Sequence, residues 1–271
     1  AALALGAAPA FADALVGTPG PDVLPGTPGP DQIFGEDGSD RIDGRAGNDY
    51  LEAGPGDDLV LGGDGVDLAI GGTGSDRITL DAGADIAYAG PGADTVLGGT
   101  GADQIFAQPG DDKVFGDAGD DSIYAGTGAD QVQGGAGNDQ LYGDGDGSSF
   151  AGGAGDDRIF ARGMSATLAG GPGADLLVAS AGNDILRGGA GRDTISAGVA
   201  FTDDLITAIE SSRYAHDTLV LVTYDESGGY FDHVAPPPRS AVDGKDYGPR
   251  VPTFAIGRFA RAGHVSHVEL E

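Results

Sequence analysis

The sequence of 271 residues contains no cysteine and no tryptophan, and it has only one methionine. Without cysteine, neither disulfide bonds nor thiolate metal sites can hold the fold together. Lysine and arginine are also scarce, with 14 of them against 43 acidic residues and a formal net charge of −29. So negative a surface repels phosphates, which argues against a nucleic-acid partner. No run is long and apolar enough to predict a transmembrane segment.

The first residues, 1–12, are apolar and rich in alanine, and they end in Ala10-Phe11-Ala12 before Asp13. This pattern is typical of the end of a signal-peptide hydrophobic region with a small-x-small cleavage site. It predicts a signal-peptide remnant, and therefore a secreted, extracellular protein. A secreted chain without disulfide bonds needs another means of stabilisation, for which bound metal is the usual choice.

The acidic residues are concentrated in the glycine-rich part of the chain. Residues 197–271 hold 11 acidic and 6 basic residues, so residues 1–196 hold 32 acidic and 8 basic residues and carry a charge of −24. Most of these acids are aspartates, whose hard carboxylate oxygens suit cations such as calcium. A solvated acidic tail is the alternative, and the periodicity of the sequence argues against it.

From Gly17 to Ser196 the sequence divides into twenty nonapeptides without an insertion or deletion. Position six is aspartate in eighteen of them, the exceptions being Ser148 and Ala166. Position eight is apolar in all twenty, and glycine recurs at positions one, two and four, as in Gly98-Gly-Thr-Gly-Ala-Asp-Gln-Ile-Phe106. A period of nine held this long indicates a solenoid.

These nonapeptides resemble the RTX family of calcium-binding repeats, whose pattern is G-G-x-G-x-D-x-U-x. The resemblance covers residues 17–196. It implies an all-β fold, a right-handed parallel β-roll of about ten coils with two repeats per coil and calcium between successive coils. It also implies that the position-six aspartates bind calcium: Asp22, Asp31, Asp40, Asp49, Asp58, Asp67, Asp76, Asp85, Asp94, Asp103, Asp112, Asp121, Asp130, Asp139, Asp157, Asp175, Asp184 and Asp193.

The physical chemistry of the repeat leads to the same fold. Glycine permits a positive φ in the turn, and the residues around position eight predict a short strand with its apolar side chain inward. Calcium takes about 6–8 oxygen ligands, more than one turn supplies, so two stacked turns must share an ion. A core of one aliphatic residue per strand is thin, so we expect calcium to drive folding.

Sorting the repeats by side predicts two asymmetries. Ser148 and Ala166 belong to repeats fifteen and seventeen, so one row of calcium sites is interrupted, and about fifteen of the sites stay intact. Position nine of the even repeats predicts an aromatic ladder on one sheet, which serves either as cross-strand stacking or as a docking face for a partner. The rings of the predicted docking face are Tyr88, Phe106, Tyr124, Tyr142 and Phe160.

After Ser196 the period ends, and all four histidines lie beyond it. Residues 203–212 predict a short amphipathic helix, and residues 218–223 (Thr-Leu-Val-Leu-Val-Thr) predict a buried strand. That strand leads into Tyr224-Asp225-Glu226-Ser-Gly-Gly, which is typical either of the rim of an α/β active site or of an ordinary turn.

Residues 203–271, with the core Asp-Glu-x-Gly-Gly-x-x-Asp-His-Val, resemble the end of bacterial phosphoesterases of the phospholipase C and acid phosphatase type. The resemblance implies a small, partial α/β segment in which Asp225 and Glu226 hold one further divalent metal. Such enzymes also need upstream metal ligands and a nucleophile, and residues 17–196 offer only β-roll repeats. We therefore expect no hydrolysis by this chain alone; if it is an enzyme, it is a phosphoric ester hydrolase. The change at residues 196–201 is compatible with a fusion, a fragment or an assembly error.

Three functions follow from these features. The first is a calcium-responsive structural or binding module that folds after export. The second is a secreted metal-dependent phosphoesterase that carries an RTX region, and the third is an adhesion rod.

Overall fold

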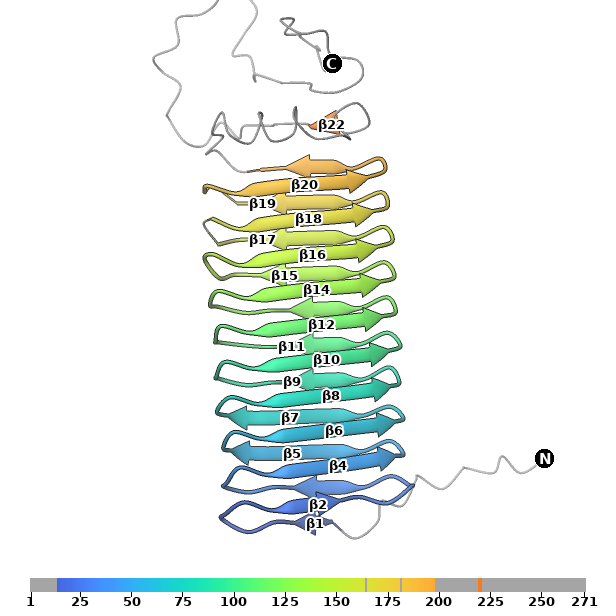
Figure 1. Ribbon diagram of the computed structural model, residues 1–271, viewed down its shortest axis with the longest axis vertical. Helices are drawn as coiled ribbons and strands as arrows, with labels where there is room; N and C mark the ends of the chain where they lie inside the picture. The colour runs from blue at the N-terminus through green and yellow to red at the C-terminus, as the bar shows by residue number, and fades with distance from the viewer. Residues whose placement is uncertain (1–13, 164, 181, 198–218, 221–271) are drawn as a thin grey trace, which may run out of the picture.

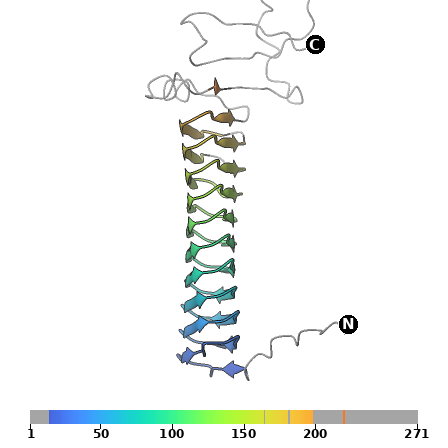
Figure 2. The same ribbon diagram turned by 90° about the vertical axis from the view of Figure 1, so that its right-hand side faces the viewer.

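The computed structural model describes residues 14–163, 165–180, 182–197 and 219–220, and every regular element in these ranges is a β-strand. The strands stack along one axis into a rod of two parallel sheets (Figure 1). The view turned by 90° shows the two sheets as the two sides of a thin roll (Figure 2). No helix in the described part of the chain meets the length and hydropathy needed to span a bilayer.

One sheet has twelve strands and the other has ten, and consecutive strands alternate between them throughout the repeat array. The twelve-stranded sheet contains, in order, β1 (Leu15–Val16), β3 (Gln32–Phe34), β5 (Tyr50–Pro55), β7 (Leu68–Thr73), β9 (Ile86–Tyr88), β11 (Gln104–Phe106), β13 (Ser122–Tyr124), β15 (Gln140–Gly143), β17 (Arg158–Ala161), β19 (Leu176–Ala179), β21 (Thr194–Ser196) and β22 (Leu219–Val220). The ten-stranded sheet contains β2 (Val23–Pro25), β4 (Arg41–Ala46), β6 (Leu59–Asp64), β8 (Arg77–Ala82), β10 (Thr95–Thr100), β12 (Lys113–Ala118), β14 (Gln131–Ala136), β16 (Ser149–Ala154), β18 (Thr167–Pro172) and β20 (Ile185–Ala190).

The register confirms two repeats per coil. In the ten-stranded sheet Val96 pairs with Val114, and Val114 pairs with Val132, so neighbouring strands are 18 residues apart. Strands β2 to β21 come one from each nonapeptide, which gives the ten coils expected of the array. The structure is therefore the predicted parallel β-roll.

The core is one residue deep on each sheet. In β11, Ile105 at position eight is fully buried, whereas Gln104 and Phe106 on either side of it face outward, as period-two alternation requires. Position one also points inward, and it is glycine or a small residue in most repeats, for example Ala107. Aliphatic side chains of both sheets thus fill the roll from Leu24 to Ile195.

The turns need backbone conformations that favour glycine. Gly101 at position four has φ of +130°, and a β-carbon there would collide with the carbonyl oxygen of Gly83 in the preceding coil. Position two also lies in the left-handed region, and it tolerates other residues: Glu36 and Arg45 both have φ of +75°. Glycine is therefore favoured at both positions, although Asp146 and Met164 occupy position four of repeats fifteen and seventeen.

The aromatic ladder predicted from position nine is present on the twelve-stranded sheet. Five rings from adjacent strands stack with centroids 4.8 to 5.2 Å apart and interplanar angles of 5° to 8°. The rings are those of Tyr88, Phe106, Tyr124, Tyr142 and Phe160. Their spacing equals the distance between neighbouring strands, so the ladder follows directly from the register.

Several expectations lie outside the described residues: the signal-peptide remnant (1–12), the helix (203–212) and the phosphoesterase motif with Asp225 and Glu226. Of the strand expected over residues 218–223, the structure describes Leu219–Val220. These two residues form β22, which pairs in parallel with β21 at the end of the roll.

Candidate metal-binding turns

The position-six aspartates form two columns, one on each edge of the roll. Turns that lead into the twelve-stranded sheet carry the even column: Asp31, Asp49, Asp67, Asp85, Asp103, Asp121, Asp139, Asp157, Asp175 and Asp193. Turns that lead into the ten-stranded sheet carry the odd column: Asp22, Asp40, Asp58, Asp76, Asp94, Asp112, Asp130, Ser148, Ala166 and Asp184. All of these aspartates except Asp22 are buried. The structure therefore brings the predicted site residues together along the axis.

Beyond the first coil, each aspartate accepts a hydrogen bond from the preceding coil. The backbone N–H of Asp103 donates to Oδ1 of Asp121 at 2.8 Å, and that of Asp121 donates to Oδ1 of Asp139 at 2.9 Å. In the even column this pattern continues without a break from Asp31 to Asp193. The bond fixes the orientation of each carboxylate and leaves its second oxygen to face the other way.

That second oxygen, Oδ2, is buried and has no hydrogen-bond partner in sixteen of the aspartates. They are Asp40, Asp49, Asp58, Asp67, Asp76, Asp85, Asp94, Asp103, Asp112, Asp121, Asp130, Asp139, Asp157, Asp175, Asp184 and Asp193. A buried carboxylate oxygen without a donor is costly, and one such oxygen per turn is a repeated feature of the fold. A bound cation is the simplest compensation.

The space next to several of the orphaned oxygens is lined by a second acceptor. A β-carbon on Gly44, at position one, would lie 2.6 Å from Oδ2 of Asp49 and 2.6 Å from the carbonyl oxygen of Gly62 in the next coil. The equivalent distances at Gly98 are 2.7 Å to Oδ2 of Asp103 and 2.6 Å to the carbonyl oxygen of Gly116. Two acceptors converge there, and one of them, Oδ2, has no hydrogen-bond donor. Oxygen-only surroundings of this kind fit calcium.

The charges in the columns are unfavourable without a cation. Burial raises the pKa of Asp76, Asp85, Asp112, Asp121 and Asp157 to about 7. Hydrogen bonds from the preceding coil act against this shift, and the neighbouring carboxylates of the same column raise the pKa further. A divalent cation would offset both the cost of burying the charged carboxylates and the repulsion between them.

The first two aspartates differ from the rest. The backbone N–H of Thr18 donates to Oδ2 of Asp22 at 2.6 Å, and that of Thr27 donates to Oδ2 of Asp31 at 2.5 Å. The hydroxyl of Thr18 lies 2.9 Å from the same Oδ2 of Asp22. Protein donors therefore satisfy the carboxylates of the first coil, a feature that position-six counting did not reveal.

A second column of hydrogen bonds, which the sequence analysis did not predict, lies outside the columns of position-six aspartates. Side chains of Asn or Asp at position five accept hydrogen bonds from the backbone of the following coil, as in Asp120 Oδ1 with the N–H of Asn138 at 2.7 Å. Asn138 Oδ1 accepts in turn from Asp156, and Asp156 Oδ1 accepts from Ala174, both at 2.8 Å. The recurring Gly-Asn-Asp and Gly-Asp-Asp triplets were the available signal. These bonds clamp successive turns together.

No cluster of three or more histidine, cysteine, aspartate or glutamate side chains that could hold a metal occurs in the described ranges. A cation in these turns therefore depends on carboxylates of adjacent coils together with backbone carbonyls. Asp225 and Glu226 lie outside the described residues, so their role as ligands stays a prediction.

Comparison with known families bears on both parts of the chain. The model of the RTX calcium-binding nonapeptide repeat matches residues 25–60, 61–96, 88–123, 115–149 and 167–199, more than half of the sequence. The chain belongs to the RTX calcium-binding repeat family. The RTX repeats identify the roll as a calcium-binding region, in agreement with its oxygen-lined turns.

The model of the Phosphoesterase family matches residues 190–271. Over 86 residues the chain is 33% identical to non-specific phospholipase C1 of Arabidopsis thaliana. The aligned segment covers 27% of this chain and 16% of that protein. Non-specific phospholipase C5 of the same plant is 33% identical over 87 residues, with the same coverage. The chain thus spans about a sixth of the length of these relatives.

Proposed function

We propose that this protein is a secreted RTX module whose β-roll, residues 17–196, takes up calcium in its turns and folds because of that uptake. The observation that carries the proposal is the set of sixteen buried Oδ2 atoms without a hydrogen-bond partner. At Asp49, Asp103 and Asp121 a carbonyl oxygen of the next coil lies close to the space beside Oδ2, and a cation there would interact with both acceptors.

The ligands in this proposal are the eighteen position-six aspartates. Beyond the first coil, each carboxylate faces the preceding coil with Oδ1 and the following coil with Oδ2, so one ion is shared by two turns. About fifteen ions are expected from counting the gaps whose two bordering repeats both carry an aspartate. At a dissociation constant of about 10⁻⁴ M, millimolar calcium contributes about 1.4 kcal/mol per site. Many such increments favour the roll over a glycine-rich unfolded chain.

Export supplies the calcium in this proposal, because extracellular calcium is far more abundant than cytosolic calcium. The alanine-rich residues 1–12 support secretion, and RTX membership is in keeping with it. The folded rod then acts as a structural or binding module. Its stacked aromatic rings stabilise the sheet, and docking of a partner on the same face stays a prediction.

The experiment is to locate the ions. Crystals grown in calcium should give anomalous peaks in two columns that follow the position-six aspartates, with the even column continuous past Asp139, Asp157 and Asp175. Peaks that lie elsewhere, or no ordered metal in the turns, would contradict the assignment of ligands.

A second candidate function is that of a secreted phosphoesterase carrying an RTX region, and the Phosphoesterase match over residues 190–271 favours it. In this hypothesis Asp225 and Glu226 hold a divalent metal that polarises a phosphoryl oxygen. The aligned segment covers about a sixth of the length of the phospholipase relatives. The described residues of the roll offer no nucleophile with a partner base. The calcium-binding module therefore stays the main proposal.

A further inference from the structure

The odd column is interrupted at repeats fifteen and seventeen. Two of its gaps, between Ser148 and Ala166 and between Ala166 and Asp184, have no carboxylate on the side that elsewhere contributes Oδ2. We call these two gaps the seam. Ser148 and Ala166 are as deeply buried as the aspartates they replace, with 0% and 1% of their surfaces exposed. The coil geometry therefore continues through the seam, and the chemistry of the gaps changes.

An aromatic side chain fills the first gap of the seam. At a regular position-one glycine, the nearest atoms beyond the glycine are Oδ2 of its own repeat and a carbonyl oxygen of the next coil. At Gly143 the nearest atoms are instead those of Phe150. A β-carbon added to Gly143 would collide with Cζ of this ring and would lie 3.1 Å from its two Cε atoms. Phe150 is 1% exposed and is the largest of the fully buried side chains. Its ring occupies the place where oxygens converge in the other turns.

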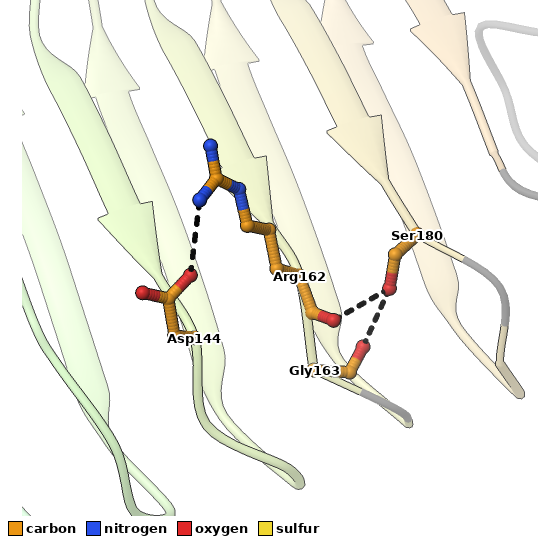
Figure 3. A network of polar contacts seen from close by, with 4 residues as sticks. All are labelled: Asp144, Arg162, Gly163 and Ser180. Atoms are coloured by element: carbon orange, nitrogen blue, oxygen red, sulfur yellow. Dashed lines mark hydrogen bonds and ion pairs between the residues drawn. The ribbon is translucent and has the colours of Figure 1, made fainter.

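Protein donors engage the oxygens around the seam. The carbonyl oxygen of Gly143 accepts from the N–H of Arg162 at 2.8 Å, and that of Ala161 accepts from the N–H of Ser180 at 2.9 Å. The hydroxyl of Ser180 lies 2.7 Å from the carbonyl oxygen of Arg162 and 3.2 Å from that of Gly163 (Figure 3). Its single proton can serve either carbonyl. Position-one carbonyls of regular coils also accept backbone hydrogen bonds, as Ala89 does from Gly72, so the hydroxyl of Ser180 is the donor that distinguishes the seam.

Ser148 continues the coil-to-coil bonding that a carboxylate provides elsewhere. Its hydroxyl oxygen accepts from the N–H of Asp130 at 3.1 Å and lies 3.1 Å from the carbonyl oxygen of Gly128 and 3.3 Å from that of Gly145. Ser148 thus accepts the hydrogen bond that Oδ1 of an aspartate accepts in the other coils. Unlike aspartate, it carries no charge and has no second oxygen to face the next gap. The coil on this side is joined to its neighbour by a neutral group.

An exposed ion pair also lies close by. The guanidinium of Arg162, at position two, is 3.8 Å from the carboxylate of Asp144 in the preceding coil of the same edge (Figure 3). Both side chains are well exposed, so the pair adds little to stability. The pair is neutral overall, so it offers a cation entering the seam no net attraction.

We propose that the seam is free of metal in the calcium-loaded protein, because Phe150 plugs the first gap and, in the second, Ala166 brings no carboxylate while the hydroxyl of Ser180 engages the carbonyls. This inference rests on the proposed calcium loading of the regular turns. The residues of the seam do not fit calcium, which needs several free oxygens and tolerates no ring in their place. Residues 150–166, which include Phe150, Arg162 and Ala166, also lie between two ranges matched by the RTX model.

The seam divides the odd column into a run of seven aspartates, Asp22 to Asp130, and the single Asp184. On this edge, the sharing of ions from coil to coil stops at Asp130, whereas the even column continues past the same coils. The gap beside Asp130 still holds a buried Oδ2 without a partner. The proposal therefore covers two gaps, one fewer than the three that border repeats fifteen and seventeen, so an ion beside Asp130 makes about sixteen ions in the wild type, where counting paired aspartates gives about fifteen.

The test counts bound calcium in full-length variants by native mass spectrometry at saturating calcium. Restoring both aspartates and removing the plug (S148D/F150I/A166D) should add about two ions to the wild-type number. Restoring the aspartates with Phe150 in place (S148D/A166D) should add about one, in the second gap only. The control Phe150→Ile, which opens the gap without a carboxylate, should add none.

A gain of two ions in S148D/A166D would show that Phe150 excludes nothing, and no gain in a folded triple variant would overturn the proposal. If the triple variant does not fold, anomalous scattering from wild-type crystals decides: a peak in either gap of the seam contradicts it, and peaks in the even column beside an empty seam support it. Absence of metal from every turn would overturn the calcium-loading function itself, which is a different result.

Discussion

The backbone N–H of Asp103 donates to Oδ1 of Asp121, 18 residues further along, and Oδ2 of the same Asp121 carboxylate is buried without a partner. One side chain therefore contacts two successive gaps of its column. Calcium in one gap orients the carboxylate that also borders the next gap. This relationship makes neighbouring sites interdependent, and its consequences can be measured.

Replacing Asp121 by asparagine should remove one calcium ion and raise the calcium concentration needed for folding. Asparagine keeps the oxygen that accepts from Asp103, but it presents an amide donor where Oδ2 was. In millimolar calcium we expect a loss of about 1.4 kcal/mol or more in the free energy of unfolding. The matched control is Asp120→Asn, since exposed Asp120 keeps its acceptor for Asn138 after the change. Equal losses in both variants, measured by chemical denaturation, would contradict the assignment.

The calcium-free roll should be more stable at acid pH than at alkaline pH. Burial raises the pKa of Asp85 and Asp157 to about 7, from 3.8 in an unperturbed aspartate. Between these values the folded state binds more protons than the unfolded state, so stability is greatest below about pH 3.8 and is lost as the pH rises through about 7.

Far-UV circular dichroism in chelator should therefore show more β-structure at pH 5 than at pH 8. With calcium present the dependence should weaken or reverse, because protons and calcium compete for the same oxygens. A chelated protein with equal or less β-structure at pH 5 would show that the buried carboxylates do not control the apo state.

Truncating the central ring of the ladder should destabilise the loaded roll. Tyr124 stacks on both Phe106 and Tyr142, so Tyr124→Ala removes two ring pairs worth roughly 0.5–1.5 kcal/mol each. Phe115 occupies position nine on the opposite sheet and stacks on no ring among the described residues, which makes Phe115→Ala the control. Thermal unfolding in saturating calcium should show the larger drop for Tyr124→Ala. A larger drop for Phe115→Ala would mean that stacking adds nothing beyond burial.

The chain by itself should not hydrolyse phosphate esters above background. Turnover needs an activated nucleophile and stabilisation of the developing charge, and the roll presents serine and threonine only in turns and on sheet faces. The assay uses a chromogenic phosphate ester with calcium and zinc, for the wild type and for Asp225→Ala. Robust turnover by the wild type that is lost in Asp225→Ala would contradict this prediction and show that the chain is an active phosphoesterase.

The period of nine was sufficient to predict the coils, the inward position eight and the two aspartate columns, because each follows from counting. Counting also placed Ser148 and Ala166 on one edge and aligned Tyr88, Phe106 and their successors on one sheet. The ring of Phe150 beside Gly143 was not predictable in this way, since it depends on where a side chain of unusual size points. The threonine donors to Asp22 and Asp31 and the outer ladder through Asp120 and Asn138 likewise depend on the distances between coils. The phosphoesterase motif lies outside the described residues and stays a prediction.

The central claim is that calcium in the turns drives folding, and far-UV circular dichroism of the full chain during a calcium titration tests it most directly. In chelator at neutral pH the spectrum should be that of a largely unfolded chain, and millimolar calcium should convert it cooperatively to β-structure, with reversal by renewed chelation. An identical β-spectrum in chelator and in calcium would contradict the account.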